Sequence, residues 1–222
     1  MKRAYKNSSN LSLPHFFRLM INSSYVIIHT ENRRFLYYKL NFHKSKRGKQ
    51  YIMNKEEYKA AANYWNEKEY KTMPTSELKP LVEEYLSASC VCALATGADD
   101  YVRCTPLEYT YYDGNFWIFT EGGEKFIGLE KNSNVSLAVF EKSASFAELK
   151  SVQVMGKSKV IEPMSDEYIA QSERKKIPIT ALKKLIEQGH PMHLLCIEPT
   201  RMDILFSQFK KLGYDSRQKL EF

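Results

Sequence analysis

The stretch of residues 101–141 constrains the fold most, because it contains a strong β-hairpin signal. Residues 101–112 are rich in Tyr, Thr and Val, which favour β-strands. Asp113-Gly114 follows, and both residues tolerate the positive φ angles that a two-residue hairpin turn requires. Residues 116–120 are therefore predicted to form a second strand that pairs back on the first.

Gly122-Gly123 ends this hairpin, and the pattern then predicts a helix over residues 124–131 and a strand over residues 135–140. Free backbone amides and the positive end of the helix dipole suit a phosphate group at the start of that helix. Four polar side chains are expected nearby: Arg103, Thr105, Thr120 and Lys125. The sequence therefore predicts a phosphate-bearing ligand that lies along an aromatic hairpin.

Each of these four residues also has a simpler explanation. Lys125 could be a helix lysine whose side chain meets solvent. Arg103 lies within an apolar strand, where a guanidinium needs either an anion or the protein surface. Threonine favours strands in its own right, so Thr105 and Thr120 are the weaker candidates.

Apolar spacing and turn residues predict the remaining elements. Helices are predicted over residues 55–71, 75–86, 166–176 and 180–188, and strands over residues 89–95, 149–161 and 192–198. Gly156 predicts a bulge or bend in its strand. Residues 202–211 are expected to form a helix or turn before a polar tail over residues 213–222. About six strands with short turns, and helices grouped between them, predict a small closed antiparallel barrel.

The basic charge of the chain is confined to its first quarter. Residues 1–52 hold 11 Lys and Arg but only Glu31, whereas residues 53–222 hold 22 Lys and Arg against 25 Asp and Glu. The first segment could be a targeting peptide or an RNA-binding tail. We favour a disordered extension or translated leader, with Met53 as a native start of the domain over residues 53–222. A nucleic-acid partner is not expected.

Four cysteines bear on compartment and metal content: Cys90, Cys92, Cys104 and Cys196. Cys90 and Cys92 share a strand face, but no second such pair or nearby His completes a tetrahedral zinc set, so no metal is expected. Reduced, buried thiols in the cytoplasm explain them better. No run of about 20 apolar residues suggests a membrane span.

Four motifs occur in a specific order: RCTPLEY from residue 103, FTEGGEK from residue 119, LEKNSNVSLAVF from residue 129 and QVMGKSKVIEP from residue 153. Together they resemble the pyridoxamine 5′-phosphate oxidase-related, FMN-binding split-barrel family, over roughly residues 78–198. The resemblance implies a mainly β (α+β) fold, a six-stranded antiparallel Greek-key split barrel with flanking helices. It also implies a homodimer with FMN at the subunit interface.

The resemblance assigns FMN contacts to three segments. They are Arg103, Cys104, Thr105, Pro106 and Leu107 on the first strand, Phe119, Thr120, Gly123, Glu124 and Lys125 at the hairpin end and helix start, and Ser151 and Gln153 on the later strand. Phe119 is as well explained by the core. Family members closest to the oxidase carry Gln at the position of Ser151, and Gln153 lies two residues on, hence on the same face.

Two of these segments depart from the family pattern. Pro106 has no amide, so Thr105 or Leu107 has to donate to the flavin ring instead. Relatives commonly carry Ser-Arg-Lys before the helix, where this chain has Gly123-Glu124-Lys125. One cation of the expected phosphate site is therefore missing.

The chain ends in SRQKLEF and lacks the Arg-x-Arg-x-x-Pro-like motif of the true oxidase, so that activity is not expected. No His is expected near the hairpin to serve as a general base, because His190 and His193 flank the last predicted strand, and the catalytic residues are unknown. We expect an FMN-dependent oxidoreductase that takes electrons from NADH or NADPH. The alternatives are a flavin-storing or flavin-sensing module without turnover, and a haem-handling split barrel.

Overall fold

The computed structural model describes residues 20–22, 25–28, 36–39, 51–65, 67–142 and 145–222 of the chain. The chain divides into two compact units, residues 1–66 and residues 67–222. Each unit has its own antiparallel sheet.

The described residues of the first unit form three short strands and one helix. The strands β1 (Met20–Asn22), β2 (Tyr25–Ile28) and β3 (Leu36–Lys39) pair in chain order. Helix α1 (Lys55–Asn63) begins with a capping box in which the Asn54 and Glu57 side chains each accept the other residue's amide. The helix predicted over residues 55–71 therefore starts as expected but ends earlier. The rest of the basic segment lies outside the described residues.

The second unit is built on an eight-stranded sheet whose order is β5-β4-β8-β9-β10-β7-β6, with β11 also paired to β10. Its strands are β4 (Val91–Ala98), β5 (Tyr101–Glu108), β6 (Thr110–Tyr112), β7 (Asn115–Thr120), β8 (Asn134–Phe140), β9 (Lys150–Ile161), β10 (His193–Phe206) and β11 (Arg217–Glu221). The predicted fold class, a mainly antiparallel β split barrel with flanking helices, is confirmed. The strand count is eight rather than six.

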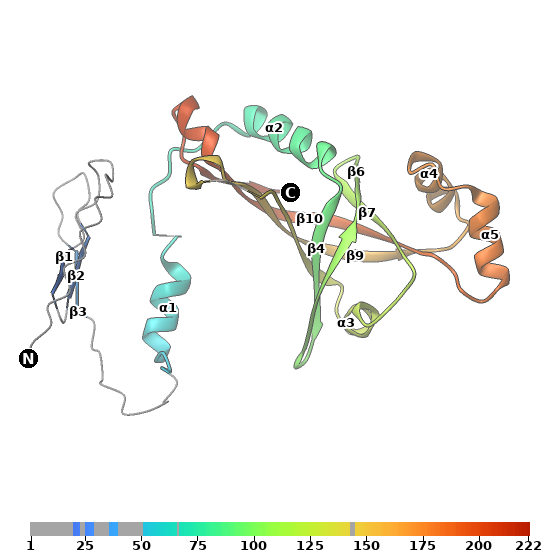
Figure 1. The fold of residues 1–222 in the computed structure, drawn as a ribbon, viewed down its shortest axis with the longest axis horizontal. Helices are drawn as coiled ribbons and strands as arrows, with labels where there is room; N and C mark the ends of the chain where they lie inside the picture. The colour runs from blue at the N-terminus through green and yellow to red at the C-terminus, as the bar shows by residue number, and fades with distance from the viewer. Residues whose placement is uncertain (1–19, 23–24, 29–35, 40–50, 66, 143–144) are drawn as a thin grey trace, which may run out of the picture. The chain divides into compact units, whose positions relative to one another are not determined.

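Four α-helices flank this sheet, and two 3₁₀ turns connect its strands. The helices are α2 (Thr75–Ala88), α3 (Lys125–Lys131), α4 (Asp166–Arg174) and α5 (Ile179–Glu187), and the turns are η1 (Phe146–Glu148) and η2 (Ser207–Leu212). Helices α4 and α5 lie next to each other in the connection between β9 and β10 (Figure 1). Among the described residues, no helix has the length and apolar character needed to cross a membrane.

The hairpin differs from its prediction in one respect. The turn is as expected, since Asp113 and Gly114 have φ angles of 51° and 76°. Residues 101–112 are not one strand, however, because the chain changes partner at Tyr109. This residue is buried, its amide donates to Cys90 O at 2.8 Å and its hydroxyl donates to Leu86 O at 2.9 Å. Consequently β7 pairs with β6, whereas β5 pairs with β4.

The end of the chain also differs from its prediction. Residues 202–211 were expected as a helix or turn, but β10 continues to Phe206 and only residues 207–212 form a 3₁₀ turn. Met202, Ile204 and Phe206 are buried at every second position, which is the period of a strand. The expected polar tail contains β11, which pairs antiparallel with the second half of β10.

Two hydrophobic clusters lie on opposite sides of the sheet. The larger one packs α2 and the inner sheet face around side chains such as Leu78, Leu94 and Phe206. The smaller one combines Trp117 of β7 with Tyr168 of α4 and Leu182 of α5. All members of both clusters that the structure describes belong to the second unit.

This arrangement makes a prediction for the basic segment. A protein that begins at Met53 should keep the flavin content and thermal stability of the full chain, because both described clusters lie in the second unit. Flavin absorbance per protein and differential scanning calorimetry on the two proteins would check this. Aggregation of the shorter protein, or loss of its flavin, would show that the segment belongs to the folded structure.

Candidate phosphate site

Strand β5 presents two sets of candidate residues on opposite faces of the sheet. Arg103 pairs with Thr96 and Thr105 pairs with Leu94, and cross-strand partners share a face. Thr96 and Leu94 are buried, so Arg103 and Thr105 lie on the inner face. Cys104 lies on the other, exposed face, as alternation along a strand requires.

Helix α3 is held against the end of β4 at two glycines. A Cβ atom on Gly128 would lie 2.9 Å from the Gly97 amide nitrogen, so the helix and the strand touch through their backbones. Before the helix, Gly122 and Gly123 have φ angles of 124° and 100°, which side-chain-bearing residues rarely adopt. These contacts place Lys125, the first residue of α3, beside β5.

Lys125 is the most unusual side chain of this region, because it is a buried cation. Only 4% of its surface is exposed, and its Nζ donates to the carbonyl oxygen of Gly122. Its pKa is lowered from the ordinary 10.5 because burial removes water from the ammonium and because Arg103 adds a nearby positive charge. The solvent-exposed alternative for Lys125 is therefore wrong. A buried ammonium with little compensation favours a bound anion.

Arg103 is paired with an acidic neighbour on α3. Its Nη1 donates to the carboxylate of Glu124, the residue that precedes the helix. Both side chains are about half exposed. The inner face of β5 and the start of α3 thus bring two cations and one carboxylate together.

Two hydroxyl groups of the same face are buried without a hydrogen-bond partner in the described part of the chain. They belong to Thr96 and Thr105, which lie on neighbouring strands next to Arg103 in register. A buried hydroxyl without a partner costs free energy, so each favours an additional acceptor or donor. Thr105 was a candidate from the sequence and Thr96 was not, although a lone Thr within the apolar β4 strand is a usable signal.

The residues of β9 lie away from this cluster within one chain. Ser151 and Gln153 alternate with the buried Val152 and Val154, so they lie on the outer face, as predicted for the pair. Strands β4 and β8 separate β9 from β5 in the sheet. One chain therefore does not bring Ser151 or Gln153 to Arg103.

The outer face is nevertheless continuous from β5 to β9. Pro106 pairs with Ala93, Ala93 with Ala138 and Ala138 with Gln153, which places the four residues in one row. The side chains between the two ends are small. The row between Pro106 and Gln153 consequently carries no large side chain.

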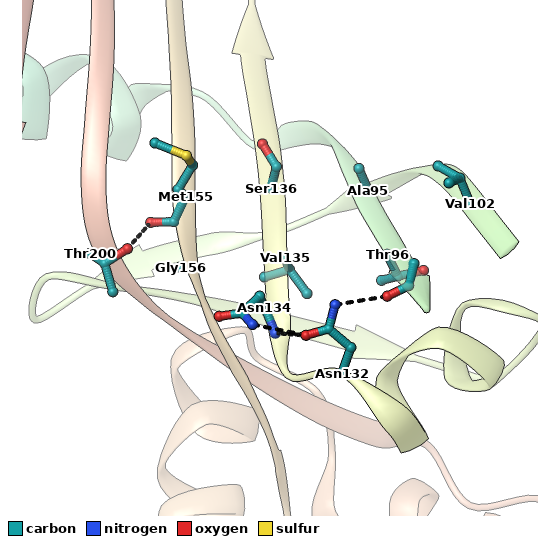
Figure 2. Close-up of a pocket in the computed structure, with 11 residues that line it drawn as sticks. Ala95, Thr96, Val102, Asn132, Asn134, Val135, Ser136, Met155, Gly156 and Thr200 are labelled. Atoms are coloured by element: carbon teal, nitrogen blue, oxygen red, sulfur yellow. Dashed lines mark hydrogen bonds between the residues drawn. The ribbon is translucent and has the colours of Figure 1, made fainter. Parts of the chain in front are cut away.

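A pocket of about 490 Å³ opens on this outer face beside the row. Figure 2 shows Asn132 at its centre, where Nδ2 donates to Gly97 O at 2.9 Å and Oδ1 accepts from both nitrogens of Asn134. On the far wall, the Thr200 hydroxyl donates to Met155 O at 3.1 Å. These bonds fix the start of β8 relative to the end of β4.

The candidate residues at the end of the hairpin lie on opposite faces of the sheet. Thr120 is buried on the inner face and pairs with His193 of β10. Phe119 packs edge-on against Tyr168, with 5.3 Å between ring centroids, so it belongs to the smaller core cluster. The His193 ring lies 5.0 Å from the Phe126 ring of α3. The expectation that no His lies near the hairpin is therefore wrong, because β10 returns to pair with β7.

The cysteines and acidic groups do not suggest further chemistry here. All four cysteines are free thiols, and burial raises the pKa of Cys92 and Cys196 to about 12. Both thiols are consequently protonated and unreactive at neutral pH. Within the described ranges, no group of three or more His, Cys, Asp and Glu is placed to hold a metal ion.

Comparisons with known proteins place this fold. No curated protein matches the chain. The structure of Campylobacter jejuni ChuZ is similar with a TM-score of 0.52 and 15% identity, covering 95% of this chain and 81% of that one. A FAD-binding protein from Mesorhizobium loti has a TM-score of 0.43 and 22% identity, with 60% and 93% covered. HutZ, the heme storage protein from Vibrio cholerae, has a TM-score of 0.44 and 17% identity, with 55% and 89% covered.

At 15% identity the Campylobacter jejuni structure shows a shared fold and nothing more. The family model described as pyridoxamine 5′-phosphate oxidase matches residues 78–206, which is more than half of the chain. That range runs from α2 to the end of β10 and contains Arg103, Glu124 and Lys125. The chain therefore belongs to the pyridoxamine 5′-phosphate oxidase family.

Proposed function

We propose that this protein is an FMN-binding flavoprotein and an oxidoreductase that accepts electrons from NADH or NADPH. The buried ammonium of Lys125 is the observation that carries the proposal, because no carboxylate of the described residues forms an ion pair with it and its Nζ bonds only a carbonyl oxygen. Arg103 lies close enough to affect its pKa and forms the second cation. A phosphate group would form charge-assisted hydrogen bonds with both residues.

The other inner-face groups also fit a phosphate. The unpaired Thr105 and Thr96 hydroxyls can donate to phosphate oxygens, and Gly123 leaves space beside the Lys125 Nζ. FMN would supply the redox chemistry, so the protein has to bind the cofactor and orient it. Strand β5 lies at an end of the sheet order, so alternate backbone groups point away from β4 and are free to bond the ring. The backbone amides nearest to Pro106, which has none, are those of Thr105 and Leu107.

The proposal includes a homodimer with the flavin between subunits. In one chain, Arg103 and Lys125 are on the inner side of β5, whereas Ser151 and Gln153 lie on the outer face three strands away. A second copy docked on the outer face would bring its own β9 residues to the flavin. Sedimentation at micromolar concentration should therefore show a dimer, and a monomer that retains FMN would contradict this part.

The test of the proposed function is the absorbance spectrum of the purified protein, followed by anaerobic titration with NADH and NADPH. We expect flavin bands that bleach with one of the two donors. Flavin bands that do not bleach would favour a binding module, and a Soret band would favour haem. Failure of the protein to bind added FMN and riboflavin would overturn the proposal altogether.

A further inference from the structure

Glu124 occupies the position where a ligand phosphate would meet Arg103. Its carboxylate accepts from the Arg103 guanidinium, although Glu124 is also the residue next to the buried Lys125. The Glu124 side chain makes no capping hydrogen bond to α3, so the ion pair is its described contact. The chain thus carries an internal anion at its own candidate phosphate site.

The charges of this cluster match a singly charged group better than a doubly charged one. Arg103 and Lys125 contribute two positive charges and Glu124 one negative charge, which leaves a formal charge of +1. The phosphomonoester of FMN carries close to two negative charges above pH 7, because its second pKa is about 6. Each phosphate in the diphosphate bridge of FAD carries one.

The cluster is also open on the side where a larger flavin would continue. The Arg103 and Glu124 side chains are 47% and 59% exposed, so groups attached beyond the phosphate can extend into solvent. Lys125, by contrast, is enclosed. A phosphodiester can therefore bind at the cations while its second substituent stays in solvent.

We propose that Glu124 is a specificity-determining residue that competes with the ligand phosphate for Arg103, so that the site takes FAD as well as FMN. The inference rests on the proposed flavin site. The carboxylate repels the dianionic phosphate of FMN more than the singly charged phosphates of FAD. Removing its charge should consequently shift the preference of the site toward FMN.

The test compares Glu124→Gln with the native protein in flavin-binding titrations at pH 8. We expect FMN to bind about fivefold more tightly, which corresponds to the upper range measured for exposed ion pairs. The affinity for FAD should rise less than twofold, and the affinity for riboflavin, which has no phosphate, should not change. The FMN gain should disappear in 1 M salt, where screening acts within about 3 Å.

Glu121→Gln is the matched control, because Glu121 is an exposed carboxylate in the same loop. It should leave all three affinities unchanged. Equal gains for FMN, FAD and riboflavin, an equal effect of Glu121→Gln, or native protein that binds FMN but not FAD would each overturn the inference while leaving the flavin site standing. Absence of all flavin binding in the native protein and both variants would overturn the proposed function and this inference together.

Discussion

Lys125→Met is expected to weaken FMN binding by about tenfold to a hundredfold and to leave riboflavin binding nearly unchanged. The lost interaction is a charge-assisted hydrogen bond, worth roughly 1.5–3 kcal/mol. Riboflavin lacks the phosphate and therefore does not use the ammonium. Fluorescence titration of both flavins against the native and variant proteins would measure the difference.

The stability of the ligand-free Lys125→Met protein is the control, because Lys125 is 4% exposed. Methionine fills a similar volume and removes a charge that burial disfavours, so the free energy of unfolding should stay the same or increase. The free energy of unfolding of the native protein should rise relative to that of the variant as pH rises from the lowered Lys125 pKa toward 10.5. Over this range the unfolded chain keeps the Lys125 proton that the folded chain has lost. FMN affinity of the native protein should fall over the same range. Equal losses for FMN and riboflavin would show that Lys125 does not bind phosphate.

Gly128→Ala is expected to lower the free energy of unfolding by about 1–3 kcal/mol and to weaken FMN binding. The new Cβ would lie 2.9 Å from the Gly97 nitrogen and 3.3 Å from the Thr96 carbonyl carbon. These are backbone atoms, so α3 has to move away from β4. Because Lys125 belongs to the same helix, the move displaces its ammonium from Arg103. Thermal denaturation with and without FMN would measure both effects.

Glu130→Ala is the appropriate comparison for Gly128→Ala, because it introduces alanine at an exposed position of the same helix. It should change the unfolding free energy by less than about 0.5 kcal/mol. A Gly128→Ala protein as stable as the Glu130→Ala protein would mean that α3 is not held by its backbone contact with β4.

Local chemistry in the sequence predicted local structure well. The Asp113-Gly114 turn has the positive φ angles that its residue types allow, and the helix predicted from residue 55 begins there. By contrast, the end of β5 could not be located within residues 101–112. Most of the twelve residues favour strands, and the tertiary contacts of Tyr109 determine where the chain leaves β4 and joins β7.

The candidate site was predicted in part for the same reason. The predicted hairpin put Arg103 and Lys125 close together, and the structure does so by a different route, because α3 contacts β5 and Glu124, the neighbour of Lys125, bonds Arg103. The burial of Lys125 depends on how closely α3 approaches β4, which a sequence does not state. His193 lies more than 60 residues from Phe126 in the sequence, so only the pairing of β10 with β7 brings the two rings together. The proposed contact of Ser151 and Gln153 with flavin requires a second chain, and the sequence of one chain does not show how two copies would pack.

The length of β10 has a consequence for how the sheet assembles. This one strand of 14 residues pairs with β7 through its first half, with β11 through its second half and with β9 throughout. In the sequence β10 follows all of its partners except β11. The ribosome therefore has to synthesise the chain past residue 206 before β10 can pair with β7 and β9. Until then, both edges offer unpaired backbone groups to other nascent chains. Once β10 is in place, its amides should exchange with solvent only through global unfolding, which joins both ends of the sheet into one cooperative unit.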